Sequence, residues 1–248
     1  MTVIAPLAII VIVALAILLW GRRLALREGP ALRPLAGYTA LRGQVGRAIE
    51  SASKLHISLG RASLTGSANP TSVAALAVLD RLAAEGCAND SPPITTVGDG
   101  TLLPLAENDL RYAAEAAKSP VGIPPGTARF IASRNDPFAY AAGVASVIQQ
   151  QKMLGNVMVG HYGQELAIVT EAAGRNQIQQ IIGSDDPLAL AVAAPVTDNL
   201  MIGEEMLAAP AYMQGKPDQI ASLQIQDILR ILLSLTILGL AVYRFVAG

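Results

Sequence analysis

Apolar residues form a long run at each end of the chain, and between the two runs apolar and polar segments alternate. Residues 3–20 contain no charged side chain. As a helix rising about 1.5 Å per residue, they extend about 27 Å, enough to cross the hydrocarbon core of a bilayer. Basic residues follow this run instead of preceding it, which argues against the alternative of a cleavable signal peptide. The pattern predicts an N-terminal transmembrane helix over residues 1–21.

The second apolar run lies at the C-terminal end of the chain. Its centre, residues 231–243, is short for a membrane span. Arg230 and Arg244 flank this centre, and their long side chains can extend toward the membrane surfaces. The alternative is a buried C-terminal helix. Apolar side chains on all sides of the helix favour a transmembrane helix over residues 228–248.

Basic side chains gather at those ends of the two runs that adjoin the middle of the chain. They are Arg22, Arg23, Arg27, Arg33, Lys216 and Arg230. The positive-inside rule therefore predicts that the middle of the chain lies in the cytoplasm and that both termini lie outside a bacterial cytoplasmic membrane. Residues 22–37 are expected to form a basic linker, and residues 214–227 a second linker.

Short apolar segments alternate with segments of helical periodicity over residues 38–213. Strands are expected at residues 55–59, 94–97, 128–132, 156–159 and 178–182, and helices at residues 71–85, 103–117, 137–152, 164–173 and from 187 onward. Asp-Pro pairs at 136–137 and 186–187 are typical of helix starts. The pattern of residues 195–213 is ambiguous as a whole and favours a helix in its second half. The alternation predicts an open, mainly parallel, Rossmann-like α/β domain of three layers, with strands that are apolar on both faces.

Ligands of such sheets bind beyond the carboxyl ends of the strands, so the residues that follow each expected strand are the candidate binding residues. They are Arg61, Gly98, Asp99, Gly100, Arg134, Asn135, His161 and Tyr162. The two arginines could hold an anion, and the glycines would let a ligand approach the backbone. The alternative is that these residues are common in turns and at helix starts for purely structural reasons.

Motifs with a defined chemistry are incomplete. Gly98-Asp99-Gly100 matches part of a dinucleotide fingerprint, but Leu103 replaces its last glycine. Neither a phosphate-binding P-loop nor a G-x-S-x-G elbow occurs. His56 lies inside an expected strand and is interpreted as a core residue, and Cys87 as a structural thiol. The sequence thus assigns no catalytic residue, no metal ligands and no cofactor.

Composition narrows the classes of partner. Charged residues make up 15% of the 248 residues, hydrophobic residues 52%, and the formal net charge is −1. A general nucleic-acid-binding protein would carry a basic surface, so nucleic acid is not an expected partner. The low charge agrees with membrane segments, which makes the lipid bilayer an expected partner.

Five segments carry a resemblance to a known family. They are HISLG at residues 56–60, PITTVGDGTLLPLA at 93–106, DPFAYAAG at 136–143, LMIGEE at 200–205 and SLQIQDILR at 222–230. Together they resemble an uncharacterised, two-span, membrane-anchored domain family of Chloroflexota-type bacteria, described as a domain of unknown function. The resemblance covers residues 37–245. It implies a bacterial membrane protein and carries no activity with it.

Three functions are compatible with these observations. The first is a membrane-anchored scaffold that assembles with itself, or with other membrane proteins, into a ring or array, because small residues in the first span permit close helix packing. The second is a cytoplasmic module that binds or senses a small polar or anionic ligand at the carboxyl edge of the sheet. The third is an enzyme with His161 as general base, which requires a nucleophile or carboxylate within hydrogen-bond reach of that imidazole.

Overall fold

A computed structural model describes residues 14–23, 32–51, 53–65, 69–120 and 122–247. The chain divides into two compact units. Pro34–Gln214 form one unit, called here the α/β domain. Met1–Arg33 and Gly215–Gly248 form the other, called here the terminal unit. Each is described by itself.

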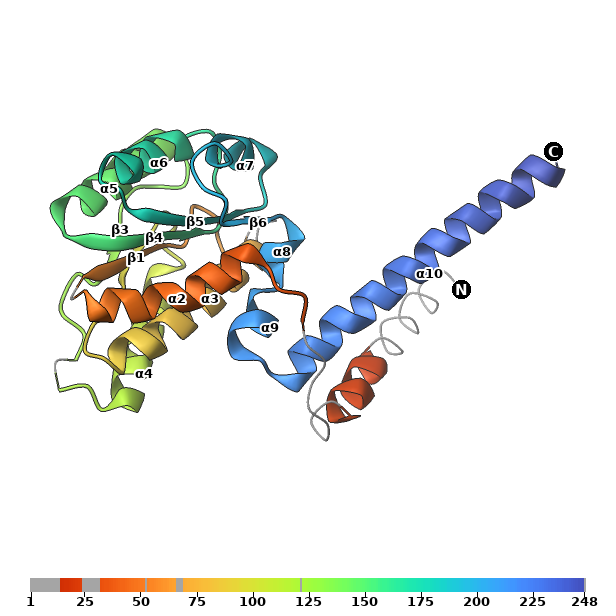
Figure 1. Cartoon of the computed structure of the whole chain (residues 1–248), viewed down its shortest axis with the longest axis horizontal. Coiled ribbons are helices and arrows are strands. Elements are labelled where there is room, and N and C mark those ends of the chain that lie inside the picture. Colours follow the sequence, from red (N-terminus) through yellow and green to blue (C-terminus); the bar gives the residue numbers. More distant parts are fainter. Residues whose placement is uncertain (1–13, 24–31, 52, 66–68, 121, 248) are drawn as a thin grey trace. The chain divides into compact units, whose positions relative to one another are not determined.

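The described residues of the α/β domain form one open sheet of six parallel strands in the order β3-β2-β1-β4-β5-β6 (Figure 1). The strands are β1 (Lys54–Ser58), β2 (Ile94–Val97), β3 (Ala128–Phe130), β4 (Met153–Val159), β5 (Gln179–Ser184) and β6 (Leu200–Ile202). This confirms the predicted α/β fold with a parallel sheet. The sixth strand lies in the region that the sequence pattern left open.

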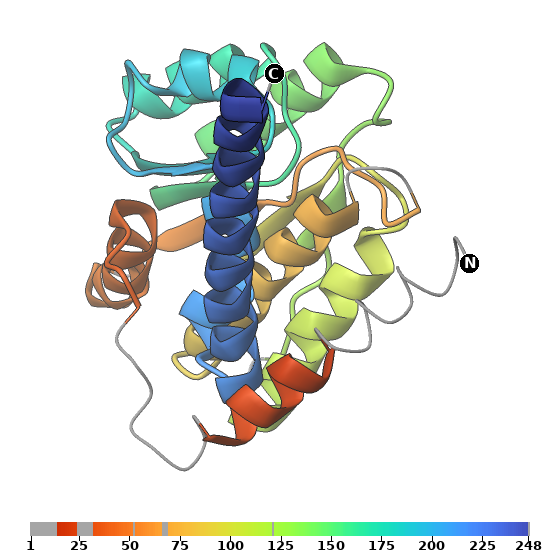
Figure 2. The same ribbon diagram turned by 90° about the vertical axis from the view of Figure 1, so that its right-hand side faces the viewer.

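Helices cover both faces of this sheet, as the two perpendicular views show (Figures 1 and 2). One face carries α2 (Ala36–Glu50), α3 (Asn69–Cys87) and α4 (Leu103–Ala117). The opposite face carries α5 (Pro137–Gln150), α6 (Leu166–Arg175) and α7 (Pro187–Ala193). Two short helices, α8 (Glu204–Leu207) and α9 (Ala209–Gln214), follow β6 and pack with the first group. Each helix after a strand therefore starts at the carboxyl edge of the sheet.

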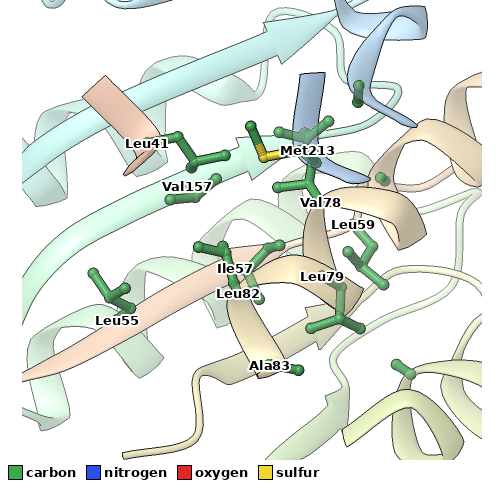
Figure 3. Close-up of a cluster of buried hydrophobic side chains, with 14 of the residues drawn as sticks. Leu41, Leu55, Ile57, Leu59, Val78, Leu79, Leu82, Ala83, Val157 and Met213 are labelled. Carbon is green, nitrogen blue, oxygen red and sulfur yellow. The ribbon is translucent and has the colours of Figure 1, made fainter. Parts of the chain in front are cut away.

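The core between the sheet and α3 follows from the twofold period of β1. Leu55 and Ile57 point to the same face, and both are almost fully buried. Figure 3 shows them against Val78, Leu79 and Leu82 of α3. Leu79 and Leu82 belong to the series Val73, Leu76, Leu79 and Leu82 that predicted a helix here, whereas Val73 is 49% exposed.

The other face of β1 is polar, contrary to the expectation of strands that are apolar on both faces. His56 and Ser58 point to this face and are fully buried beneath α5 and α6. His56 Nδ1 lies 2.7 Å from Asn156 Oδ1 on β4, and its Nε2 lies 3.0 Å from Thr96 Oγ1 on β2. Both ring nitrogens have partners, which confirms that His56 is a core residue. Burial dominates the shift that lowers its pKa to about 4.

Helix α2 was not predicted: the expected linker ended at residue 37, the first strand was expected at residues 55–59, and no element was assigned between them. Its buried residues Tyr38, Leu41 and Val45 nevertheless recur at helical spacing. The Tyr38 ring stacks on that of Tyr212 in α9, with centroids 4.6 Å apart. Arg42 Nη2 donates a hydrogen bond of 2.8 Å to the Tyr212 carbonyl. These contacts hold the first and last helices of the α/β domain together.

The start of α7 agrees with the sequence pattern, whereas the end of α3 differs from it. Asp186 caps α7 as predicted, with Oδ1 accepting from the Leu188 N–H at 2.8 Å. The helix expected over residues 71–85 is α3, which continues past Gly86 through Cys87. A Cβ at Gly86 would lie 2.6 Å from the Ser91 carbonyl oxygen. Gly86 therefore allows the chain after α3 to pass close to the end of this helix.

Among its described residues, the terminal unit has one helix that is long and apolar enough to cross a membrane, by length and composition alone. It is α10 (Pro217–Ala247), and the qualifying stretch is Pro217–Phe245. Residues 214–227 were expected to be a linker, whereas α10 begins at Pro217 and runs through most of them without a break. The predicted N-terminal span lies largely outside the described residues; residues 14–23 are helical. Trp20 Nε1 donates to Gln224 Oε1 of α10 at 2.7 Å.

Candidate functional site

The strand order creates a switch point between β1 and β4. From β1 the chain crosses toward β2 and β3, and from β4 it crosses the other way toward β5 and β6. In open α/β sheets, ligands bind outside the carboxyl ends of the two strands at such a point. Gly60-Arg61 follows β1, and Gly160-His161 follows β4. The switch point thus brings Arg61 and His161, two of the predicted binding residues, to adjacent strand ends.

The two strand ends approach so closely that one position admits no side chain. The Arg61 N–H donates to the His161 carbonyl at 3.1 Å. Gly60 has φ +74°, and a Cβ there would lie 2.8 Å from the His161 nitrogen and 2.9 Å from its oxygen. Glycine is required here both by the left-handed backbone and by the adjacent strand end.

We therefore expect Gly60→Ala to lower the free energy of unfolding by more than about 1–2 kcal/mol, the cost of the left-handed conformation alone. The clash with the His161 backbone adds to this cost. Gly100→Ala is the matched control, because a Cβ at Gly100 meets no atom within 4 Å. Urea unfolding of both variants in detergent measures the difference. Equal stability of the two variants would contradict the close approach of β1 and β4.

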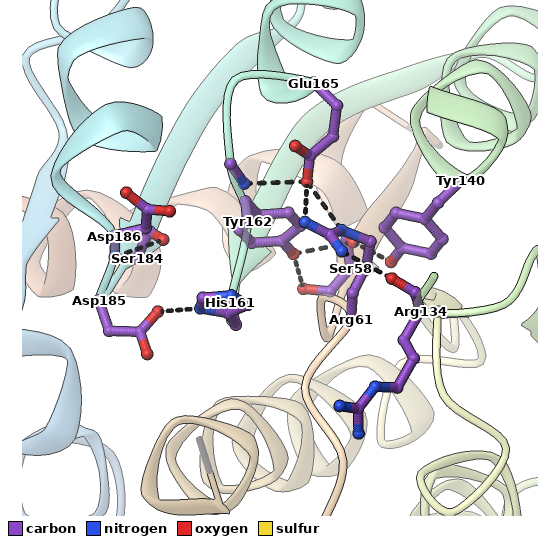
Figure 4. Close-up of polar contacts among 11 residues, drawn as sticks. Ser58, Arg61, Arg134, Tyr140, His161, Tyr162, Glu165, Ser184, Asp185 and Asp186 are labelled. Atoms are coloured by element: carbon purple, nitrogen blue, oxygen red, sulfur yellow. Dashed lines mark hydrogen bonds and ion pairs between the residues drawn. The ribbon is translucent and has the colours of Figure 1, made fainter. Parts of the chain in front are cut away.

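Arg61 is occupied by contacts within the protein. Its Nε and Nη2 lie 2.8 and 2.7 Å from Glu165 Oε1, and Nη1 donates to the Arg134 carbonyl at 2.8 Å (Figure 4). The same Glu165 oxygen accepts from the Gly163 N–H at 2.9 Å. Arg61 therefore joins the loops after β1, β3 and β4. Its positive charge is balanced by Glu165, so Arg61 is a structural centre of the edge more than a free anion ligand.

Gly98 and Tyr162 also have structural partners. A Cβ at Gly98 would lie 2.9 Å from Arg61 Cγ and 3.0 Å from the Tyr140 ring. Tyr162 donates from its hydroxyl to the Ser58 carbonyl at 2.8 Å, and Tyr140 Oη lies 2.7 Å from Ser58 Oγ (Figure 4). Burial raises the pKa of Tyr140 to about 12 and raises that of Tyr162 as well. The two phenols are neutral anchors beneath the edge.

His161 forms a hydrogen-bonded chain with two residues from other strand ends. Its Nδ1 lies 2.8 Å from Asp185 Oδ1 after β5, and Asp185 Oδ2 accepts from the Thr71 hydroxyl of α3 at 3.0 Å (Figure 4). The side chains of His161 and Asp185 are 37% and 32% exposed. No residue in the described part of the chain bonds His161 Nε2. An oriented imidazole with one open nitrogen therefore lies at the switch point.

The contact between His161 and Asp185 raises the pKa of the histidine and lowers the pKa of the aspartate. The hydrogen bond to Asp185 raises the pKa of His161 and outweighs the opposite effects of partial burial and the Arg61 charge. Partial burial disfavours ionisation of Asp185, but bonds from His161 and Thr71 and the His161 charge outweigh it and lower the Asp185 pKa. Asp185 is therefore anionic at neutral pH, which stabilises the imidazolium.

The remaining predicted residues lie farther out along the edge, on the loops after β2 and β3. Asp99 Oδ1 accepts from the Thr101 N–H at 2.9 Å and from its hydroxyl at 2.5 Å. Gly100, Arg134 and Asn135 are exposed. Within the described residues, the Arg134 side chain makes no hydrogen bond or ion pair. In Figure 4 its guanidinium points away from Glu165.

Fixed charges along this edge do not sum to a cationic pocket. Glu165 neutralises Arg61, whereas the Arg134 guanidinium forms no ion pair with any residue that the structure describes. Carboxylates at Asp99, Asp136, Asp185 and Asp186 lie on the same strand ends and helix starts. They offset the positive ends of the helix dipoles. The charge distribution therefore favours a neutral polar ligand over a multiply charged anion.

Comparison with known proteins places the chain in a family. The family described as "Domain of unknown function (DUF6754)" matches residues 1–247. The chain belongs to the DUF6754 family. No curated protein and no solved structure matches the chain. Membership in DUF6754 assigns no activity to the chain.

The sequence located one half of this site and missed the other half. Arg61 and His161 were predicted from their positions after strands. Their partners Glu165, Asp185 and Thr71 were not, although Glu165 and Asp185 lie within the stretches that follow β4 and β5. Their positions after strands could have identified them, but only the strand order shows that Glu165 pairs with Arg61 and Asp185 with His161.

Proposed function

We propose that this DUF6754 chain is a membrane-anchored module that binds a small, neutral, polar ligand at the carboxyl edge of its sheet. The observation that carries the proposal is the switch point between β1 and β4, where His161 is oriented by Asp185 and keeps Nε2 open. Arg134 and the exposed loop after β3 border the same edge. A ligand hydroxyl could donate to the open His161 Nε2, and a ligand carbonyl could accept from Arg134.

The membrane part of the proposal rests on α10 and on the distribution of basic residues. The described side chains between Gln226 and Phe245 are exposed, and most of them are apolar. Exposed apolar side chains all along a helix are stable in lipid but not in water. We propose two spans, with the α/β domain in the cytoplasm and both termini outside, because Arg22, Arg23 and Lys216 lie beside the spans.

A thermal-shift screen of the full-length protein in detergent tests the ligand proposal. The probes are nucleosides, monosaccharides, polyols and amino acids, with inorganic phosphate as the anionic comparison. We expect one neutral class to raise the melting temperature of the wild type but not of His161→Ala. Stabilisation by phosphate alone, or by no probe, would refute the proposed ligand class.

A second candidate function is a self-assembling scaffold, and a specific observation favours it. Large apolar side chains are exposed at the carboxyl edge: Phe138 and Leu188 in the first turns of α5 and α7, and Ile202 at the end of β6. Exposed apolar groups of this kind often mark contacts between proteins. We expect a second copy of the chain as the occupant. Native mass measurement of the protein in lipid nanodiscs should give a single multiple of the protomer mass, and a monomer would exclude the scaffold.

A further inference from the structure

The His161–Asp185 pair has a geometry that ligand binding alone does not need. With Nδ1–H donated to Asp185, the neutral imidazole carries its lone pair on Nε2. A carboxylate on one nitrogen and an open second nitrogen form the arrangement in which histidine accepts and returns protons. Thr71 fixes the carboxylate in turn through its hydroxyl. The enzyme hypothesis requires a nucleophile or a carboxylate within hydrogen-bond reach of His161, and Asp185 is such a carboxylate.

Backbone hydrogen bonds to the strand ends on both sides fix the loop that carries His161. The His161 carbonyl accepts from the Arg61 N–H, and the Gly160 N–H donates to the Gly183 carbonyl at 3.1 Å. The next residue, Tyr162, is anchored through its hydroxyl to Ser58. A catalytic base must be held within a fraction of an ångström of its working position. The loop after β4 is therefore preorganised around His161.

We propose that the carboxyl edge is a hydrolase site for a neutral carboxylic ester, with His161 as its general base. This inference rests on the proposed binding function and adds a reaction to it. No described serine, threonine or cysteine bonds His161, so the nucleophile is water. A neutral substrate agrees with the acidic residues that border the site.

The proposed reaction balances with water as its second reactant. His161 Nε2 takes a proton from the water as its oxygen attacks the carbonyl carbon. The tetrahedral intermediate then breaks the bond to the alcohol oxygen, and the imidazolium returns its proton to that leaving group. The products are a carboxylic acid and an alcohol. The Arg134 guanidinium, which pairs with no described residue, is available to stabilise the negative charge on the carbonyl oxygen.

Charged groups around His161 set the direction of its pH dependence. Asp185 and Asp186 raise its pKa, whereas Arg61 and partial burial lower it, and the net shift is upward. The base form exists above this pKa, so the rate of ester hydrolysis should rise with pH and reach a plateau. Removing Asp185 should move the rise to lower pH. The loss of orientation should also lower the plateau.

The chain offers a direct readout of His161, because it has two histidines and His56 is fully buried. Carbethoxylation by diethyl pyrocarbonate, followed by absorbance, therefore reports on His161 in the folded protein. The reaction itself is followed with 4-nitrophenyl acetate on the full-length protein in detergent. The variants are His161→Gln and Asp185→Asn. Asp186→Asn is the matched control, since Asp186 is adjacent but bonds the Leu188 N–H instead of His161.

We expect His161→Gln to lower the rate on the order of 100-fold, the usual contribution of a general base. Asp185→Asn should lower both the plateau and the apparent pKa, whereas Asp186→Asn should keep the plateau. Circular dichroism melting checks that the variants fold. If His161 reacts with diethyl pyrocarbonate but wild type and His161→Gln hydrolyse the ester equally, the hydrolase is refuted and the binding function stands. If His161 is unreactive in the folded protein, the edge is closed and both proposals fail.

Discussion

Replacing Glu165 with glutamine should destabilise the α/β domain by about 3–5 kcal/mol, the usual effect of breaking a buried ion pair from one side. The side chains of Arg61 and Glu165 are 14% and 4% exposed. Glutamine keeps the shape of Glu165 but leaves the Arg61 charge without its partner in a poorly solvated place. The loops after β1, β3 and β4 would lose their common contact, so the switch point should loosen with the fold.

Glu171→Gln is the matched control for this experiment. Glu171 also pairs with an arginine, Arg175, at 2.8 Å, but the two side chains are 65% and 76% exposed. Exposed pairs of this kind contribute about 0–1 kcal/mol. Urea unfolding of the full-length protein in detergent measures both variants at neutral pH. A loss for Glu165→Gln no larger than that for Glu171→Gln would mean that Arg61 is well solvated and does not hold the edge together.

Acidification should produce the second large effect, through His56. Its pKa is lowered to about 4 by burial, from an ordinary value of 6.5. The unfolded chain therefore binds a proton at a higher pH than the folded chain does. Stability from this residue is complete above pH 6.5 and falls as the pH drops toward 4. The difference of about 2.5 pKa units corresponds to about 3 kcal/mol.

Measuring this effect requires a comparison of variants, because other groups titrate in the same range. Asp109 has a pKa raised to about 6 by burial and by the charge of Asp80. It binds its proton first in the folded state, so it adds stability as the pH falls and partly masks His56. Urea unfolding between pH 7 and pH 4 should show a steeper loss in Asp109→Asn than in wild type. A similar loss in the double variant that also carries His56→Gln would show that His56 is not the cause.

The sequence predicted the repeating part of the fold because that part is encoded locally. Alternating apolar strands and amphipathic helices identify the layers, and Asp186 followed by Pro187 marks a helix start without any tertiary information. β6 is different. It has three residues, and it exists because Gly183 pairs with Met201 on the neighbouring strand. No local pattern encodes that pairing, so the sequence left this region open.

Half of the candidate site is local in the same sense. A residue after a strand must lie at the carboxyl edge, which places Arg61 and His161 there. Their partners depend on the strand order, because β4 lies between β1 and β5. That neighbourhood brings Glu165 to Arg61 and Asp185 to His161. Of the two arginines predicted as anion ligands, Arg61 is therefore held in an ion pair with Glu165, whereas the Arg134 guanidinium pairs with no described residue.

Contact between the first and last helices of the α/β domain has a mechanical consequence. The Tyr38–Tyr212 stack and the Arg42 bond to the Tyr212 carbonyl join the segments through which the chain enters and leaves this domain. Any pull transmitted along both connections would first peel α2 from α9, one contact at a time. Little of that load would reach the hydrogen bonds between the strands. The edge that carries His161 would thus be shielded from forces acting on the chain ends.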